Sequence, residues 1–337
     1  MAAYYRAFGL TFQSSEPLPW LPPEPAVDGA DVQIEFYSHC TPPKPNPNES
    51  LRTELPGDFP SSPPQLSVWQ RTSDGRFRFR YLDGTEFTVD AYGRQIRAAW
   101  PEGLTIEDAA AYLLGPITGF VLRLRGVVCL HASAVSDAGR ALALMAPAGF
   151  GKSSSGAVFA RWGYTVLTDD ILAIQEQDGG FRVLPGGPHL RLWPSSVAAL
   201  FGRHDALPRL SPTHADWDKR YLDLAESPFR FAPDPVPLKM IYTGRPVQGP
   251  GPDHIETLAP LEALKALLAN TYSWYALDGA MRAAELDCLT RIAENVPVHL
   301  LFASDPAPAR LEERCRAICK DASTMGFEIF SAVEHSH

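Results

Sequence analysis

Residues 141–162 read ALALMAPAGFGKSSSGAVFARW, and they contain the motif on which the predicted fold depends. The apolar run at the start is typical of a buried strand, and the residues from Lys152 onward are typical of a helix. Between them, residues 146–153 follow the phosphate-loop pattern G-x-x-x-x-G-K-[ST] except at its first position, where Ala146 replaces glycine. Gly149 and Gly151 let backbone amides approach an anion, and the lysine neutralises outer phosphates. The stretch therefore predicts a strand, a phosphate-binding loop and a helix in succession.

The alternative is an ordinary glycine-rich turn in which Lys152 faces solvent. The combination of these residue types with a strand before them and a helix after them favours phosphate binding. Ala146 begins the turn, away from the inner glycines, so the substitution at this position is compatible with binding.

Three titratable side chains follow strand-like segments. Asp169 and Asp170 come directly after YTVLT (residues 164–168), and His131 follows VVCL (residues 127–130). A strand that delivers carboxylates to a nucleotide site is the expected source of a magnesium ligand. Two adjacent acids can divide the work, one holding the metal and the other accepting the proton of an attacking hydroxyl. The alternatives are a solvated strand end for the acids and a structural hydrogen bond for the histidine.

The pattern of the whole chain indicates two regions. Residues 1–100 alternate in the manner of an antiparallel sheet, with strands predicted at DVQIEF (31–36), QLSVWQ (65–70), FRFRYL (77–82) and EFTVDAYG (86–93). Residues 105–124 predict a connecting helical region that begins near Thr105 and Asp108 and breaks or kinks at Gly115-Pro116. After residue 125, short apolar strands alternate with helices, which predicts an α/β core. Strands are predicted at 141–146, 164–168, 171–176, 237–244 and 296–303, and helices at 152–162, 259–269, 278–295 and 307–320.

Composition excludes several classes of protein. A formal net charge of −9 argues against a broad nucleic-acid-binding surface. The five cysteines are odd in number and scattered, which favours reduced thiols over a disulfide framework. The start of the sequence lacks the pattern of a secretion signal, and no later segment has 18 uncharged apolar residues in succession. We therefore expect a cytoplasmic protein with neither nucleic acid nor membrane as a partner.

The segments LHASAV (130–135), APAGFGKSSS (146–155) and VLTDDILAI (166–174) resemble, in that order, the catalytic core of HPr kinase/phosphorylase and its relatives. The resemblance covers residues 125–195. It implies an α/β phosphate-loop core related to that of phosphoenolpyruvate carboxykinase, and an α+β chain overall. It also implies transfer of phosphate from ATP or another nucleoside triphosphate, with Mg²⁺, to a serine of a protein.

The resemblance implies a role for each candidate residue. The residues expected to bind the nucleotide are Ala148, Gly149, Phe150, Gly151, Lys152, Ser153 and Ser154. The Ser153 hydroxyl and Asp170 are expected to hold Mg²⁺. Asp169 is expected to act as the base for the serine hydroxyl, and His131 is expected to lie beside Asp169 and tune it.

Two later segments depart from the family pattern or extend it. In PHLRLWPSSVAALFG (188–202), HPr kinases carry an acidic residue two places before an arginine; here His189 takes that position and Arg191 is kept. The change removes one carboxylate from the expected metal site and puts phosphorolysis in doubt. Arg191 is a candidate to stabilise the transferring charge, with an ordinary ion pair as the alternative. Lys219 and Arg220, in DWDKRYLDL (216–224), are candidates to approach the γ-phosphate, or else belong to an exposed charged loop.

The segments YRAFGLTFQSSEPLPWL (5–21) and LRLWP (190–194) resemble a branch of these kinases found with peptide natural-product pathways, including those that modify lasso peptide precursors. The resemblance implies a serine-bearing peptide or small protein as the acceptor. We expect a β-rich domain over residues 1–104, which would recruit the peptide along a sheet edge, and a catalytic domain over residues 105–337. The oligomeric state is left open.

Two other functions compete with a serine kinase. One is a kinase for a free small molecule, because a phosphate loop identifies the donor and not the acceptor. The other is a nucleotide-sensing interaction protein without turnover, which the departures at Ala146 and His189 favour and which intact Lys152, Ser153 and acid pair oppose. The sequence favours a magnesium-dependent serine kinase.

Overall fold

The computed structural model describes residues 2–38, 48–56, 63–214, 217–247, 253–303 and 310–324. The contacts between residues divide the chain into two units. The first consists of Met1–Val127, Leu210–Trp217 and Ser273–Arg282; the second consists of Val128–Arg209, Asp218–Tyr272 and Ala283–His337. In this division the chain returns to the first unit twice after leaving it.

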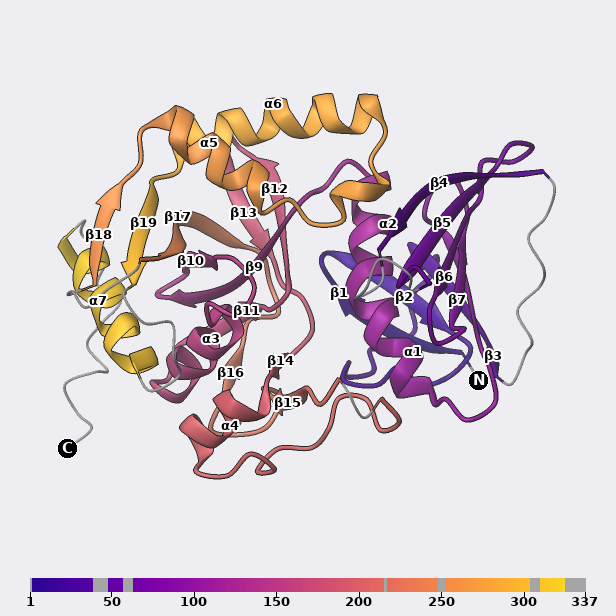
Figure 1. The fold of residues 1–337 in the computed structure, drawn as a ribbon, viewed down its shortest axis with the longest axis horizontal. Coiled ribbons are helices and arrows are strands. Elements are labelled where there is room, and N and C mark those ends of the chain that lie inside the picture. The colour runs from indigo at the N-terminus through magenta and orange to yellow at the C-terminus, as the bar shows by residue number, and fades with distance from the viewer. Residues whose placement is uncertain are drawn as a thin grey trace. The chain divides into compact units, whose positions relative to one another are not determined.

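The first unit is built on a sheet of eight strands in the order β1-β2-β3-β8-β7-β6-β5-β4 (Figure 1). The strands are β1 (Ala3–Ala7), β2 (Leu10–Ser14), β3 (Val32–Ser38), β4 (Glu49–Leu55), β5 (Leu66–Arg71), β6 (Phe77–Tyr81), β7 (Glu86–Val89) and β8 (Gln95–Trp100). Burial alternates along β2 and along β8, where Ile96, Ala98 and Trp100 are buried, as expected for a sheet with one covered face. In β5 and β6 it does not, because three consecutive residues of each strand are buried.

The prediction of an antiparallel sheet is wrong in one respect, because β3 runs parallel to both β2 and β8. Every other neighbouring pair in this sheet is antiparallel. Parallel neighbours need a long connection, and residues 15–31 supply one between β2 and β3. Local alternation reports which residues are buried but not the direction in which the chain returns.

The helical region has the predicted start and the predicted kink. It consists of α1 (Ile106–Tyr112), a π-helical turn η1 (Leu113–Ile117) and α2 (Thr118–Leu124). Thr105 and Asp108 form a capping box at the start of α1, which satisfies backbone amides that have no partner within the helix. Gly115, at φ −118° and ψ −109°, breaks the helical geometry just before Pro116.

Aromatic contacts explain why this helical region belongs to the first unit. The ring of Phe120 in α2 packs edge-on against Phe77 and Phe79 of β6, with centroids 4.8 and 5.0 Å apart. Tyr112 of α1 stacks on Tyr81 of β6 at 3.8 Å. The helices therefore cover one face of the eight-stranded sheet rather than joining the α/β core.

The second unit is a mixed sheet with helices on both faces (Figure 1). Its sheet strands are β9 (Val128–Asp137), β10 (Arg140–Met145), β11 (Thr165–Thr168), β12 (Ile171–Gln177), β13 (Gly180–Leu184), β16 (Arg230–Phe231), β17 (Val236–Pro246), β18 (His254–Thr257) and β19 (Val298–Ala303), and a separate pair is formed by β14 (His189–Leu192) and β15 (Arg220–Asp223). The later helices are α3 (Lys152–Arg161), α4 (Pro194–Phe201), α5 (Pro260–Ala269), η2 (Trp274–Ala276), α6 (Gly279–Asn295) and α7 (Leu311–Thr324). Of these, η2 and the start of α6 up to Arg282 belong to the first unit. The predicted alternation of strands and helices is confirmed; residues 307–309 of the last predicted helix lie outside the described residues.

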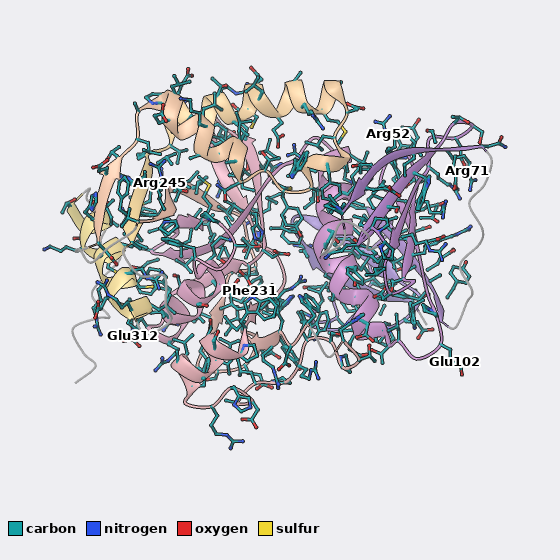
Figure 2. The ribbon with its side chains drawn as sticks, viewed as in Figure 1. Arg52, Arg71, Glu102, Phe231, Arg245 and Glu312 are labelled. Carbon is teal, nitrogen blue, oxygen red and sulfur yellow. The ribbon has the colours of Figure 1, made fainter. Side chains whose placement is uncertain are left out.

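The core of the second unit has two layers, one on each side of the sheet. Leu142 and Leu144 of β10 pack with α3, α4 and α7, whereas Ala143 and Met145 pack with α5 and α6. This follows from the twofold alternation of side chains along a strand. Phe231 of β16 packs against the layer formed by α3, α4 and α7 (Figure 2). Strand β10 therefore runs through the centre of the unit and ends directly at the predicted phosphate loop.

Two findings bear on the composition-based expectations. The four described cysteines form no disulfide, and Cys40 lies outside the described residues. Within the described part of the chain, no helix combines the length and the apolar character needed to cross a bilayer.

Candidate active site

The predicted strand, loop and helix are all present at residues 140–161. β10 ends at Met145, and α3 begins at Lys152 with Gly151 as its N-cap residue. Gly149 and Gly151 have φ values of 80° and 98°, in the left-handed region that favours glycine. Glycine at the N-cap offers no side chain to occupy the first amides of α3, which leaves them to an anion. The local geometry suits a phosphate-binding loop.

Lys152 folds back over this loop. Its Nζ donates a hydrogen bond to the carbonyl oxygen of Ala146 over 2.7 Å and lies 3.5 Å from that of Pro147. Burial lowers the pKa of Lys152, although the nearby charges of Asp169 and Asp170 act in the opposite direction. The ammonium group is thereby held at the loop rather than in solvent, and Ala146 contributes only its carbonyl to this contact.

The two acids form the turn between β11 and β12, and both strands pair with β9. Ile171 of β12 lies opposite His131, and Thr168 of β11 lies opposite Ala134. Asp170 has a φ of 70°, which is uncommon for a residue with a side chain. Strand β9 therefore pairs with the strands on both sides of the acidic turn, and this pairing places side chains of β9 next to the two carboxylates.

Both carboxylate oxygens of Asp169 accept hydrogen bonds. Ser133 Oγ donates to Oδ1 over 2.5 Å, and the backbone amide of Arg191 donates to Oδ2 over 2.9 Å. Each oxygen of an ionised carboxylate has a second lone pair, so Asp169 can still accept a proton. The two contacts hold the carboxylate in one orientation.

Asp170 is surrounded by donors and cations. Tyr272 donates its hydroxyl hydrogen to Oδ2 over 3.0 Å, and Arg191 Nη1 lies 3.5 Å from the same oxygen. Burial alone would raise the pKa of this carboxyl. The hydrogen bond with His131 and the charges of Arg191 and Lys219 outweigh burial and hold the pKa far below its ordinary value. Asp170 is therefore an anion at neutral pH.

His131 contacts Asp170 and not Asp169, which differs from the expected arrangement. Its Nδ1 lies 3.1 Å from both the carboxylate oxygen Oδ1 and the backbone carbonyl of Asp170. Both partners are acceptors, so Nδ1 must carry the hydrogen. The register explains the difference: His131 pairs with Ile171, the neighbour of Asp170, while Ser133, two residues along the same face of β9, reaches Asp169.

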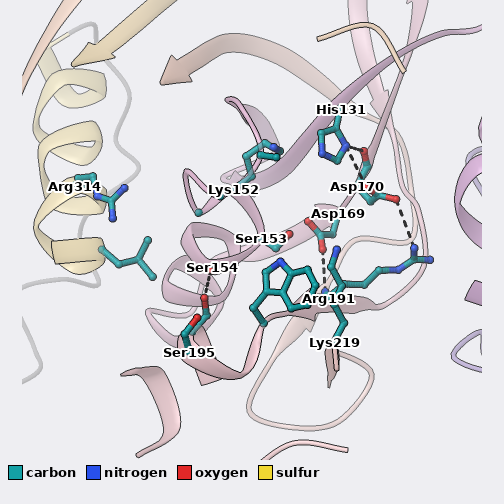
Figure 3. A pocket seen from close by; sticks show the side chains of 16 residues that line it. His131, Lys152, Ser153, Ser154, Asp169, Asp170, Arg191, Ser195, Lys219 and Arg314 are labelled. Carbon is teal, nitrogen blue, oxygen red and sulfur yellow. Dashed lines mark hydrogen bonds and ion pairs between the residues drawn. The ribbon is translucent and has the colours of Figure 1, made fainter. Parts of the chain in front are cut away.

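A cavity of about 270 Å³ brings these groups together (Figure 3). Arg314 reaches toward it from α7 on one side, and His131, Asp169 and Asp170 lie on the other. The lining residues are His131, Ala148, Gly149, Gly151, Lys152, Ser153, Ser154, Asp169, Asp170, Arg191, Trp193, Ser195, Ser196, Lys219, Leu311 and Arg314. All of the predicted site residues line this cavity except Phe150.

The cavity concentrates positive charge within an acidic chain. Four cationic side chains line it, those of Lys152, Arg191, Lys219 and Arg314, against two carboxylates. The chain as a whole carries a formal charge of −9. Such a local excess attracts a polyanion of the size of a nucleotide's phosphates.

The structure distinguishes the remaining candidates, Lys219, Arg220 and His189, by whether they line the cavity. Lys219 lines the cavity, and its Nζ lies 5.4 Å from the ring centroid of Trp193. Arg220 donates to the carbonyl of Leu207 and to Asp218, each over 3.1 Å, and does not line the cavity. His189 is buried and is likewise not among the lining residues. Of these, only Lys219 is placed to act on a ligand in the cavity.

Two of the predicted loop residues have structural contacts of their own. Ser154 Oγ donates to Ser196 Oγ over 2.7 Å. Phe150 directs its ring away from the cavity into the core layer of α3 and α7, and its carbonyl accepts a hydrogen bond from Arg314 Nη1 over 3.0 Å. The role predicted for Phe150 therefore rests on its backbone alone.

Seven residues that line the cavity or contact its carboxylates were not predicted as site residues from the sequence: Ser133, Trp193, Ser195, Ser196, Tyr272, Leu311 and Arg314. Ser133 and Trp193 lie within segments that were singled out, and the alternation of β9 places Ser133 on the face of His131. Tyr272 and Arg314 lie more than 100 positions from their partners Asp170 and Phe150. No local pattern connects residues so far apart in the sequence.

The residues in the cavity fit a magnesium–nucleotide complex. Within the described residues, no three His, Cys, Asp or Glu side chains gather as a metal cluster. Mg²⁺, however, is commonly bound through one or two carboxylates together with substrate phosphates. Asp170 and Ser153 supply hard oxygen ligands in the same cavity as the phosphate loop. They are the residues that would hold the ion.

Comparison with known proteins shows a distant structural similarity. No family model matches the chain, and no curated protein matches it. Among solved structures, the chain is similar to the HPr(Ser) kinase/phosphatase from Coxiella burnetii, with 12% sequence identity and a TM-score of 0.32. The match covers 62% of this chain and 99% of that chain. A similarity at this level assigns neither a substrate nor a role to any residue.

Proposed function

We propose that the chain is a magnesium-dependent kinase that transfers the γ-phosphoryl group of a nucleoside triphosphate to a serine hydroxyl of a peptide or small protein. One observation carries the proposal: a glycine-rich loop at a helix N-terminus, a lysine and two carboxylates line the same cavity. Phosphoryl transfer depends mainly on positioning and charge neutralisation, and these groups provide both.

The loop side of the cavity suits the phosphoryl donor. The amides at the start of α3 would bind the phosphates, and Lys152, already held at the loop by the carbonyl of Ala146, would neutralise the β- and γ-phosphates. Arg191 and Lys219 lie beside the acids, where negative charge develops on the transferred group. Bound Mg²⁺ would neutralise charge on the phosphate oxygens, with Asp170 and Ser153 as its protein ligands.

Asp169 suits the role of base for the acceptor hydroxyl. The Ser133 hydroxyl and the Arg191 amide hold its carboxylate in place, and a lone pair on each oxygen still accepts a proton. A positioned general base of this kind contributes roughly 10²- to 10⁴-fold to a reaction rate. His131 and Tyr272 contact Asp170 instead. Arg191 contacts both acids, through its amide and its guanidinium group, but the other partners of the two acids differ, which suits them to separate roles.

The choice of a peptide acceptor rests on the resemblance to peptide-modifying kinases and on the first unit. Among the described residues, its sheet ends in two edge strands, β1 and β4, and β4 pairs with β5. An edge strand offers unpaired backbone groups to an extended peptide, which gives affinity without demanding one sequence. A serine-bearing peptide that pairs with β4, such as a lasso peptide precursor, is the acceptor we propose.

The test is transfer of label from γ-labelled ATP, with Mg²⁺, to serine peptides, compared with the same peptides carrying alanine in place of serine. Asp169→Asn should lower the rate by about 10²- to 10⁴-fold while ADP still binds. Lys152→Ala should lower both ADP affinity and the rate, the latter by roughly 10²- to 10³-fold. The exposed residues Asp287 and Lys265 provide matched controls, as Asp287→Asn and Lys265→Ala.

Three outcomes would contradict the proposal. Label that reaches alanine peptides equally well excludes serine as the acceptor. Label that appears only on an added metabolite makes the chain a small-molecule kinase. Wild-type rates in both active-site variants remove the assignment of the cavity as the catalytic site.

A further inference from the structure

The last described helix, α7, contacts the phosphate loop through Arg314 and Leu311. Arg314 of α7 is only 3% exposed although it is an arginine, and its Nη1 donates to the carbonyl oxygen of Phe150 over 3.0 Å. Its guanidinium group also lies 5.5 Å from the ring centroid of Phe150. Leu311, one turn earlier on the same helix, lies 3.4 Å from where a Cβ at Gly151 would be.

The geometry points to Arg314 as a positioning residue for the phosphate loop: by holding the Phe150 carbonyl toward α7, it fixes the Phe150–Gly151 peptide in the orientation that binds phosphate. This inference rests on the proposed function, because it gives that loop a nucleotide to bind. Nothing in the local sequence of the loop supplies this contact, since its donor comes from 164 positions further along the chain.

Because the peptide unit is planar, the direction of the Phe150 carbonyl also sets the direction of the Gly151 amide. In a trans peptide, the carbonyl of Phe150 and the amide hydrogen of Gly151 point in opposite directions. A carbonyl held against α7 therefore directs the Gly151 amide away from that helix, and Gly151 itself lines the cavity. If this peptide turned over, a carbonyl oxygen would replace an amide hydrogen at an anion site, and its partial negative charge would repel the phosphates.

The side chain of Phe150 secures the same peptide from the other direction. Its ring is buried over Gly244 of β17 so closely that a Cβ there would lie 2.1 Å from Cε1. Both the ring and the carbonyl of Phe150 are thus anchored, the ring by β17 and the carbonyl by α7. Gly151, at φ 98°, is the flexible residue that such anchoring must restrain.

An arginine suits this position better than a neutral donor. A hydrogen bond from a charged donor to a carbonyl is stronger than one between neutral groups, and a buried carbonyl is costly to leave without a partner. Because Arg314 also lines the cavity, direct contact with a phosphate is the competing role. The two roles differ in whether Phe150 is needed for the effect.

The experiment measures ADP and AMP affinity of the full-length chain without metal, for the wild type, Arg314→Met, Gly244→Ala and the double variant. Arg316→Met is the matched control, because Arg316 is on the same helix and its side chain is 59% exposed. We expect Arg314→Met to weaken ADP binding at least about tenfold and AMP binding less than about twofold, since the loop holds the outer phosphates.

The double variant separates positioning from direct contact. Gly244→Ala displaces Phe150, so Arg314→Met should cost little more in that background; the same full loss again would mean direct phosphate contact and would overturn the inference. Hydrogen exchange provides a second measurement on the protein without nucleotide. The Ser155 amide, which donates to the Gly151 carbonyl over 2.7 Å, should exchange faster in Arg314→Met than in Arg316→Met.

The experiment distinguishes failure of the proposed function from failure of the role given to Arg314. A wild-type chain that binds no ADP contradicts the proposed function. A wild-type chain that binds ADP, with an Arg314→Met variant of equal affinity and equal Ser155 exchange, leaves the function standing and overturns the role of Arg314.

Discussion

Replacement of Gly244 by alanine tests whether the packing of Phe150 against Gly244 positions the proposed phosphate loop, because one added methyl group is enough to displace the Phe150 ring. The new Cβ would lie 2.1, 2.4 and 2.5 Å from three carbons of the Phe150 ring. Carbon atoms in favourable contact are about 3.5 Å apart, so the ring must move by at least about 1.4 Å. We expect a shift of that size to reach the backbone of Phe150 and to separate its carbonyl from Arg314 Nη1, which are 3.0 Å apart in the wild type.

The expected cost follows from overpacking of a buried site. Phe150 is 9% exposed and belongs to the core layer of α3 and α7, and inserting a methyl group into a packed core costs about 1–3 kcal/mol. For a unit of about 200 residues this lowers Tm by roughly 2–12 °C. Because the carbonyl loses its partner as well, ADP affinity should fall together with stability.

Thermal unfolding and ADP titration of Gly244→Ala measure both effects. Gly279→Ala is the matched control, because the same change there places no heavy atom within 4 Å of the new Cβ and Gly279 is outside the left-handed region. Alanine at a helix start should leave Tm unchanged or slightly higher. A Gly244→Ala protein with wild-type Tm and wild-type ADP affinity would show that the Phe150 ring does not pack against Gly244, and would refute the claim that this contact positions the loop.

Two further predictions concern single hydrogen-bonding groups. Tyr272→Phe removes the hydroxyl that donates to Asp170 and should weaken Mn²⁺ binding in the presence of ADP by about 10-fold or more, as measured by electron paramagnetic resonance; unchanged affinity would mean that Tyr272 does not orient this carboxylate. Burial would raise the pKa of Asp108, but hydrogen bonds from Ser211, Thr213 and the capping box outweigh it and lower the pKa. Because its pKa is lower in the folded than in the unfolded protein, Asp108 adds to the free energy of unfolding above its unfolded pKa of about 3.9. This contribution is lost as the pH falls through the lower folded pKa. Unfolding measured from pH 7 to pH 2 should therefore show a shallower acid loss in Asp108→Asn than in the wild type, and parallel curves would exclude this role.

The local pattern of the sequence was sufficient for most elements of the fold. Alternation along residues 31–36 and 77–82 identified strands, because burial of one sheet face imposes a period of two. Gly115 and Pro116 identified the kink, because proline lacks an amide hydrogen and clashes with the preceding turn. The parallel pairing of β3 and the membership of residues 105–127 in the first unit depend on distant contacts and could not be predicted in this way.

The candidate site divides in the same manner. The sequence by itself determined the strand, glycine-rich loop and helix at residues 140–161 and the position of the two acids after β11, because each of these features depends on residue types at fixed local spacing. Only the tertiary structure decided that His131 contacts Asp170 and that Ser133 donates a hydrogen bond to Asp169, because the strand register sets which side chains face each other. It also decided that Tyr272 and Arg314 join the site. Their contacts span more than 100 positions, and only the packing of β9, β17 and α7 brings such residues within hydrogen-bonding distance.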